Sequence, residues 1–215
     1  YFLYLYVFIG YSLSNAGSYD DFFSALHFDR PEVVQNLLAR GFDPNTPNEK
    51  GIAGLLVAIQ SEAPKSALVL AKHPQTHIHA RNPLGETPLM LAAIHNQLEL
   101  ARVLIERGAE VNQPGWTPLH YAATRGHREM MRLLLDNEAY IDSESANGTT
   151  PLMMAAYSAT PLAVKLLLEE GADPTLVNQG NASALDLAIS QDHLQSAFYI
   201  RAFIESWYIQ NPIKE

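Results

Sequence analysis

The chain has 215 residues, of which 47% are hydrophobic and 17% charged, the balance of a folded globular protein rather than a disordered one. Its formal net charge of -9, without any run of Lys or Arg, argues against a nucleic-acid partner and fits either a basic protein partner or simple solubility. The absence of cysteine excludes disulfides, thiolate catalysis and Cys-ligated zinc.

The first thirteen residues, YFLYLYVFIGYSL, are apolar or aromatic except for Ser12. This run is too short for a membrane span, which needs about 20 residues. It is typical of the apolar core of a secretory signal cleaved after residues 14–16, but Ser-Asn-Ala there is also a common remnant of a cleaved affinity tag. We therefore keep residues 1–16 apart from the fold and expect no stable membrane span in the mature chain. A native leader predicts a periplasmic or secreted protein, and otherwise we expect a cytoplasmic one.

A recurring element organises the rest of the chain. It reads GETPLMLAA at 85–93, GWTPLHYAA at 115–123 and GTTPLMMAA at 148–156, with weaker copies GIAGLLVA at 51–58 and NASALDLA at 181–188. Its Thr or Ser falls at positions 87, 117, 150 and 183, which gives spacings of 30, 33 and 33 residues. A fixed period of this size indicates a repeat architecture.

Leucine-rich runs that end at a glycine recur in phase with this element, as VVQNLLARG at 33–41, ARVLIERGA at 101–109 and AVKLLLEEGA at 163–172. Thr before each first helix can cap its free amides, and Pro at the next position loses no hydrogen bond there. Glycine after the second helix adopts the left-handed conformation cheaply. Each unit is therefore predicted to form two short helices, and stacking of the units supplies the core.

These elements resemble the ankyrin repeat, a unit of about 33 residues made of a β-turn and two helices. The resemblance covers residues 20 to about 205 and implies an all-α solenoid of stacked helix-turn-helix units with β-turn fingers. We expect an ankyrin-repeat domain at 17–209, a tail at 210–215, and units at 20–47, 48–81, 82–113, 114–144, 145–178 and 179–207. The first unit is expected to be a cap with a truncated first helix. The last is expected to be a polar cap, over which the aromatic stretch 198–209 folds back.

Two connectors depart from the repeat. The stretch NQPGW at 112–116 is three residues shorter than its equivalent before Thr150, which predicts a clipped finger with a tight turn at Pro114-Gly115. In the second unit, KHPQTHIH at 72–79 replaces the usual Gly-Ala-Asp turn, and Pro64 is placed to open a helix. Both changes alter the surface without breaking the predicted fold.

The resemblance places variable partner contacts on the finger tips and on the first-helix surface that lines the concave face. Trp116 is the strongest candidate anchor, because Trp, Tyr and Arg dominate interface hot spots, although its ring could instead cover its own shortened finger. The predicted partner-binding residues are Trp116, Arg125, Tyr157, Glu86, His95, Arg81 and Asn147. The positions carried over with them are Leu84, Ile94, Gln113, Thr124, Thr149, Ser158, Ala182 and Gln191.

The histidines are open to structural and functional interpretations. His120 and His127 match histidines that, in the resembling family, join a hydrogen-bond network and the turn between helices, so we expect structural roles. His73, His77 and His79 lie in one connector, and His-x-His in an extended segment places both rings on one side. A zinc site there would lack a dependable fourth ligand, so we predict no metal and favour a solvated loop.

No catalytic motif is present: the sequence holds no Gly-x-Ser-x-Gly, no phosphate-binding glycine loop and no His-Glu-x-x-His. We therefore predict a protein that is not an enzyme and needs no cofactor, and that acts as an adaptor or inhibitor by binding a protein partner. The alternatives are an accessory protein that handles a metal or small molecule through 73–79, and a bacterial effector directed at host proteins. With a native leader, the chain resembles small exported ankyrin proteins of Gram-negative bacteria.

Overall fold

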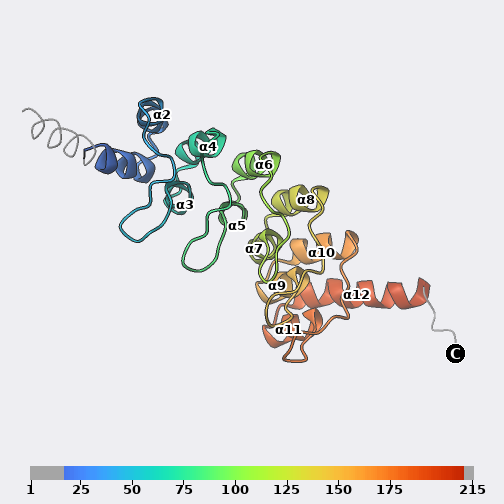
Figure 1. Cartoon of the computed structure of the whole chain (residues 1–215). Helices are drawn as coiled ribbons and strands as arrows, with labels where there is room; N and C mark the ends of the chain where they lie inside the picture. The colour runs from blue at the N-terminus through green and yellow to red at the C-terminus, as the bar shows by residue number, and fades with distance from the viewer. Residues whose placement is uncertain (1–16, 211–215) are drawn as a thin grey trace, which may run out of the picture. The chain divides into compact units, whose positions relative to one another are not determined.

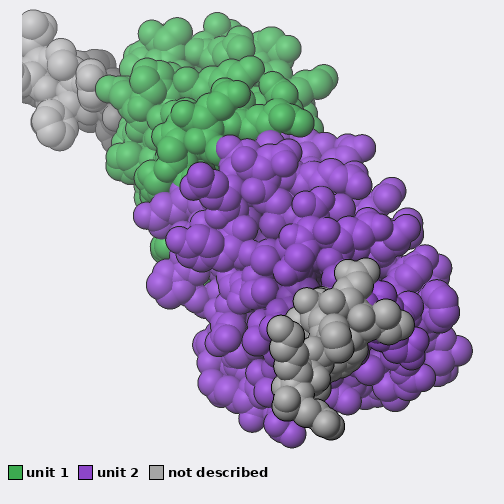
Figure 2. Space-filling model, turned by 90° about the vertical axis from the view of Figure 1, so that its right-hand side faces the viewer, with its two compact units in different colours: residues 1–91, 99–109 green, residues 92–98, 110–215 purple. Residues whose placement is uncertain are grey.

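The computed structural model describes residues 17–210, which form short helices joined by turns (Figure 1). This part of the chain holds no strand beyond two isolated β-bridges. Two compact units are distinguished: unit 1, residues 1–91 and 99–109, and unit 2, residues 92–98 and 110–215 (Figure 2). The apolar leader predicted at residues 1–16 lies outside the described residues.

Unit 1 contains a helix at residues 17–27, then α2 (Pro31–Ala39), α3 (Gly54–Gln60), α4 (Pro64–Lys72), the start of α5 (Pro88–Ile94) and most of α6 (Leu98–Glu106). Helices α2 and α3 both pack against α4. The prediction of a truncated first helix is wrong, because residues 17–27 form three helical turns. Phe22 and Leu26 are fully buried, so this helix presents an apolar face that stabilises it against the core.

Unit 2 contains α7 (Pro118–Arg125), α8 (Arg128–Asp136), α9 (Pro151–Tyr157), α10 (Pro161–Glu169), α11 (Ala184–Ser190) and α12 (Leu194–Gln210). Helices α7, α9 and α11 form one row, and α8, α10 and α12 form a second row (Figure 1). Each first-row helix also packs on the second-row helix that follows it. The alanine pairs of α7 and α9 are fully buried, which allows close approach of the first-row helices.

Helix α12 differs from the other second-row helices in length, with 17 residues against 9 in α8 and in α10. The preceding helix α10 is followed by Gly171 at φ +100°, which stops the helix in the left-handed conformation. Helix α12 instead runs to Gln210, with no glycine between Leu194 and Gln210 to interrupt it. The prediction that residues 198–209 fold back over the last unit is therefore wrong for this stretch.

The first-row helices begin with side-chain caps. The N–H of Met153 donates to Thr150 Oγ1 at 3.4 Å, and Pro151 follows at the first helical position. At α11 the N–H of Asp186 donates to Ser183 Oγ and the N–H of Ser183 donates to Asp186 Oδ2, a reciprocal capping box. The last unit thus keeps its helix cap although it lacks the Thr-Pro pair.

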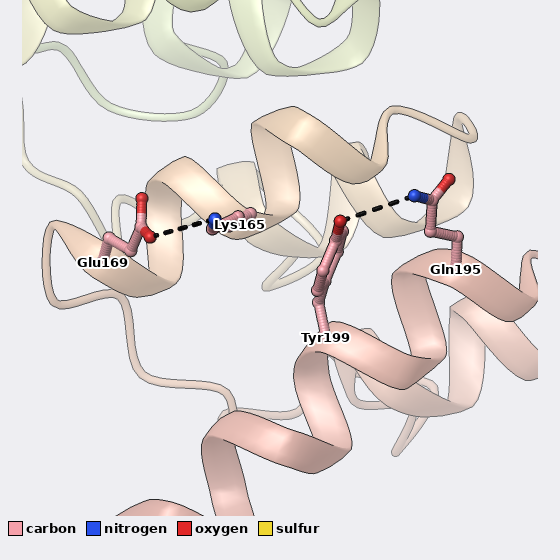
Figure 3. Close-up of polar contacts among 4 residues, drawn as sticks. All are labelled: Lys165, Glu169, Gln195 and Tyr199. Carbon is pink, nitrogen blue, oxygen red and sulfur yellow. Dashed lines mark hydrogen bonds and ion pairs between the residues drawn. The ribbon is translucent and has the colours of Figure 1, made fainter.

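The second-row helices carry polar pairs one helical turn apart at their exposed surface (Figure 3). Lys165 Nζ lies 3.6 Å from Glu169 Oε1, and Gln195 Nε2 donates to Tyr199 Oη at 3.4 Å. Exposed pairs of this kind contribute about 0–1 kcal/mol each. Helix α12 also exposes Phe198, whose side chain is 66% accessible. This surface is therefore solvated and tolerant of substitution.

Candidate partner-binding surface

Two asparagines that follow a second helix, Asn45 and Asn112, each join their own finger to the next connector through the side-chain amide. In unit 1, Asn45 accepts the N–H of His77 at 2.7 Å and donates Nδ2 to the carbonyl of Gln75 at 2.8 Å. In unit 2, Asn112 makes the same pair of bonds, accepting from Tyr140 N–H and donating to the carbonyl of Glu138. The amide side chain suits this role because it donates and accepts at once.

The clipped finger of unit 2 holds Trp116. The predicted shortening is present: the bridging residue Asn112 and the N-cap Thr117 are five positions apart, whereas Asp142 and Thr150 are eight apart. Gly115 has φ +83°, which a residue with a side chain rarely adopts, and Gln113 Nε2 donates to the carbonyl of Trp116 at 2.7 Å.

The Trp116 ring rests on helix α7. Its centroid lies 5.3 Å from that of His120 and 5.4 Å from that of Tyr121, the latter in an edge-on arrangement. Its side chain remains 39% exposed. The ring therefore packs on the first helix of its own unit while keeping one part accessible, the geometry that an interface anchor needs.

His120 supports this arrangement from within the core, where it is fully buried. The N–H of Thr117 donates to His120 Nδ1 at 3.2 Å, so Nδ1 is the unprotonated acceptor. Nε2 therefore carries the proton and donates to the carbonyl of Thr149 at 2.9 Å. Burial lowers the pKa of His120, and the hydrogen bond to Thr149 opposes this in part. The neutral ring thus ties α7 to the next finger, in the structural role predicted for it.

The other predicted contact residues of unit 2 are exposed. Tyr157, at the end of α9, is 48% accessible. The equivalent residues of the neighbouring repeats, Thr124 and Ser190, have smaller side chains. Arg125 ends α7 and is exposed, with no hydrogen bond or ion pair to any other described residue. His95 and Asn147 are exposed as well.

The predicted contact residues of unit 1 belong to one finger. Arg81 Nη1 donates to the carbonyl of Gly85 at 2.8 Å, and Asn82 Nδ2 donates to Glu86 Oε2 at 2.6 Å. Both predicted side chains are thus engaged in their own turn. Among the positions carried over with them, Leu84 is 83% exposed, but Thr149 of unit 2 is 6% exposed. The interpretation of Thr149 as a contact residue is wrong, because its main chain is held beneath the surface by His120.

The connector at residues 72–79, in unit 1, carries the three histidines of the metal-handling alternative. The three histidines are not brought together, and the described residues contain no group of three His, Asp or Glu side chains that could hold a metal ion. The expected extended conformation is also wrong: residues 78 and 79 form a turn, with Ile78 buried and His77 and His79 exposed on either side of it. The connector is a turn with exposed histidines, and their placement does not favour the metal-handling alternative.

Arg107 holds this connector in place. Its guanidinium donates to the carbonyls of Ala71, Pro74 and Thr76 at 2.6, 3.1 and 3.3 Å. These carbonyls lie in the last turn of α4 and just after it, where three other repeats have a glycine turn, at Gly41, Gly108 and Gly171. The planar fork of an arginine can satisfy several such acceptors at once. An arginine from the following helix pair thus stabilises the turn that lacks its glycine.

A family model for ankyrin repeats, in three copies, matches residues 22–114, 55–145 and 112–178. The chain belongs to the ankyrin-repeat family. Its fold is the all-α ankyrin solenoid that the sequence predicts, and such repeats are generally protein-protein interaction modules rather than enzymes. None of the helices within residues 17–210 has the length and apolar character required to cross a membrane.

Several known proteins are similar to this ankyrin-repeat chain. Ankyrin repeat and SAM domain-containing protein 6 of Rattus norvegicus is 29% identical over 146 residues, 68% of this chain. The human NF-kappa-B inhibitor alpha is 35% identical over 89 residues, 39% of this chain. The matches span 13% and 28%, respectively, of the length of these relatives.

Solved ankyrin domains have the same fold. The human ASB11 ankyrin repeat domain is 28% identical, with a TM-score of 0.77 over 85% of this chain and 82% of that domain. An ankyrin repeat domain from Acinetobacter baumannii has a TM-score of 0.73 over 85% of this chain and 96% of that one. At 23% identity, the second likeness concerns the fold alone.

Sequence reasoning missed the groups that position the anchor. Tyr121 lies five residues after Trp116 and packs against its ring, a contact that depends on how the clipped finger meets α7.

Proposed function

We propose that this ankyrin-repeat protein acts as an adaptor or inhibitor that binds a protein partner through the first-helix and finger surface of unit 2. The observation that carries the proposal is Trp116, which is accessible yet held on two aromatic neighbours. A preordered aromatic side chain contributes contact area at a low entropic cost when a partner binds. An inhibitor of this family, the human NF-kappa-B inhibitor alpha, is among the relatives, which supports a role through binding alone.

Two further exposed residues of unit 2 fit the composition of an interface. Tyr157 adds a second exposed aromatic ring, and Arg125 adds a positive charge that no described acidic group neutralises. Tyr, Trp and Arg are the residue types most enriched in interface hot spots. The arrangement supplies binding groups, and the described residues bring together no set of catalytic side chains around them.

The test compares variants at exposed positions of unit 2. Immobilised wild-type chain, Trp116→Ala, Tyr157→Ala and the matched control Phe198→Ala are incubated with extract of the source organism. Retained proteins are then quantified by mass spectrometry. We expect at least one protein to be retained by wild type and Phe198→Ala but lost from both other variants. Equal retention by all four chains would refute the proposal, provided that circular dichroism shows each variant folded.

A further inference from the structure

Three finger tips are held by an asparagine at the start of their turn. In the last finger, Asn178 Oδ1 accepts the N–H of Gly180 at 2.9 Å and that of Ala182 at 3.1 Å. Asn48 and Asn82 accept the equivalent two N–H groups in their own fingers. In each of these turns the main chain is therefore fixed two and four positions after the asparagine.

The finger at residues 145–149 carries Ser145 at the position of these asparagines. Ser145 Oγ accepts the N–H of Thr149 at 3.1 Å, but it donates to Asn147 Oδ1 at 2.6 Å. Among the described residues, no group accepts the N–H of Asn147. The main chain of this turn is therefore held at one point fewer than in the fingers that carry asparagine.

Asn147 is followed by Gly148, and this is the only Asn-Gly pair in the sequence. Residue 147 is exposed, and none of the described residues bonds to its Nδ2 atom. Gly148 has φ +75° and no side chain that could shield its main-chain nitrogen from the preceding side chain. The Ser145 hydroxyl polarises the Asn147 amide and is placed to stabilise negative charge that develops on Oδ1. The turn thus presents an activated amide to an unshielded main-chain nitrogen.

We propose that Asn147 is a site of spontaneous covalent modification, at which the side-chain amide is lost and aspartate or isoaspartate forms. The main-chain nitrogen of Gly148 gives up its proton and bonds to Asn147 Cγ. The Cγ–Nδ2 bond then breaks, ammonia leaves with that proton, and a cyclic imide remains. Water adds to one imide carbonyl carbon and breaks its bond to the nitrogen, which regains a proton. Breaking the bond to Cγ gives aspartate, and breaking the bond to the main-chain carbon gives isoaspartate.

One hydrogen bond of the turn opposes the reaction. The N–H of Gly148 donates to the carbonyl of Ser145 at 2.9 Å, and this bond must open before the nitrogen can reach Cγ. Exposed turns open locally at a far lower free energy than the whole fold. Because the N–H of Asn147 is not held, this opening breaks no second bond of residue 147 within the turn. The reaction is therefore expected in the folded protein.

Either product changes the finger. Aspartate places a negative charge where Asn147 has a neutral amide. Isoaspartate lengthens the main chain by one methylene group and leaves the former main-chain carbonyl as a free carboxylate. In the unmodified chain, that carbonyl accepts the N–H of Gln179 at 2.9 Å. Modification to isoaspartate should therefore break the bond between this finger and the next.

The first experiment follows the purified full chain at neutral pH and physiological temperature. Peptides are analysed by mass spectrometry over time, and chromatography separates the aspartate and isoaspartate products. The exposed Asn181 is the matched control, because it lies in the equivalent turn but precedes Ala182. Asn147 should convert at least about tenfold faster than Asn181. Equal rates at the two residues, or retention of the Asn147 amide while the urea-unfolded chain converts, would overturn the proposal.

Two variants test the chemistry of the turn. Gly148→Asn adds a side chain to the attacking residue; Asn181 has φ +58° at the equivalent position, and a Cβ at 148 would lie no closer than 3.4 Å to its neighbours. Ser145→Asn supplies the acceptor that the other fingers use and removes the hydroxyl. Gly148→Asn should slow conversion at least about tenfold and Ser145→Asn about threefold, with fragment spectra assigning the loss to position 147. An unchanged rate in Gly148→Asn refutes imide formation, and one in Ser145→Asn refutes the role of the hydroxyl.

Amide exchange measured by NMR tests the effect on the neighbouring finger. In the isolated isoaspartate form, the Gln179 amide should exchange at least about tenfold faster than in the fresh chain. Asn147→Asp carries the same charge on an unaltered main chain, so its Gln179 amide should stay protected. Equal exchange in the fresh and isoaspartate forms would refute the loss of the bond, provided that circular dichroism shows both forms folded.

Discussion

Asp142 occupies the position, after a second helix, at which Asn45 and Asn112 bond to the next connector through their side-chain amides. We predict that Asp142→Asn stabilises unit 2. Both oxygens of Asp142 accept the N–H of Asp173, at 3.1 and 3.2 Å. A carboxylate has no donor for the carbonyl that the asparagines satisfy. In both asparagine bridges the accepting carbonyl lies two residues before the donating N–H, so the equivalent carbonyl here belongs to Gly171. No donor from the described residues reaches this carbonyl.

The magnitude follows from the bond that the Asp142→Asn substitution adds. One neutral hydrogen bond from the introduced side-chain amide to the Gly171 carbonyl contributes about 0.5–1.5 kcal/mol. Burial raises the pKa of Asp142, the Asp173 N–H opposes this, and the Asp173 charge adds to it. The ionised carboxylate is therefore disfavoured in the folded state. The added hydrogen bond predicts an increase of about 0.5–1.5 kcal/mol in the unfolding free energy at neutral pH, and removal of the partly solvent-screened charge acts in the same direction.

The gain should depend on pH. Because the folded-state pKa of Asp142 lies above its ordinary value of 3.8, the folded protein binds this proton more tightly than the unfolded chain. The associated stabilisation is fully present below 3.8 and is lost as the pH rises through the folded-state value. Protonated Asp142 also gains a donor for the Gly171 carbonyl. The advantage of Asp142→Asn should therefore be largest at neutral pH and shrink as the pH falls toward 3.8.

Urea unfolding of both chains, followed by circular dichroism across this pH range, measures the difference directly. Asn112→Asp is the matched control, since it creates the same missing donor one unit earlier and should lower stability by a similar amount. The reasoning fails if Asp142→Asn is no more stable than wild type at neutral pH. It also fails if the gain is independent of pH, because the carboxyl would then not be the cause.

Three further predictions concern stability. Arg107→Ala should lower the unfolding free energy, measured by urea titration, by about 2–4 kcal/mol, because three carbonyls lose a charged donor. Arg107→Lys should restore less than half of the lost unfolding free energy, because an ammonium group lacks the planar fork of the guanidinium. Gly41→Ala, at φ +86° in open space, should cost about 1–2 kcal/mol. Gly126→Ala should cost at least about 1 kcal/mol more, because a Cβ there lies 3.1 Å from Thr160; equal losses in thermal melts would contradict the packing argument. Burial lowers the folded-state pKa of His120 below 6.5, so the stabilisation by the neutral ring is complete above pH 6.5 and is lost as the pH falls through the folded-state pKa. His120→Gln in an Asp142→Asn background should make the melting temperature less dependent on pH in the acid range.

The parts of the fold that the sequence predicts correctly are those set by local chemistry. Thr150 caps a helix whose first residue is Pro151, and both functions need only neighbouring backbone atoms. Gly171 ends its helix because glycine readily adopts the positive φ of +100° found at this position. The repeat period then places these signals in phase, and stacking follows because no single unit can bury its own apolar face.

The sequence does not predict features that depend on contacts between neighbouring repeats. Arg107 reaches carbonyls 31 to 36 residues earlier, and nothing around position 107 distinguishes it from a solvated arginine at a helix end. Alternation of its residues predicts an extended histidine connector, whereas Arg107 and Asn45 hold it in a turn. The continuation of α12 beyond the length of α8 and α10 is not evident from its aromatic residues, which favour several structures.

The clipped finger and helix α7 together explain why Trp116 suits the proposed binding role. The bonds of Asn112 and His120 hold this part of the chain against the residues that follow it. Trp116 is ordered on α7 before any partner arrives, so little conformational entropy remains to be lost on binding. A partner that presents an apolar side chain to this ring therefore gains contact area at a low entropic cost.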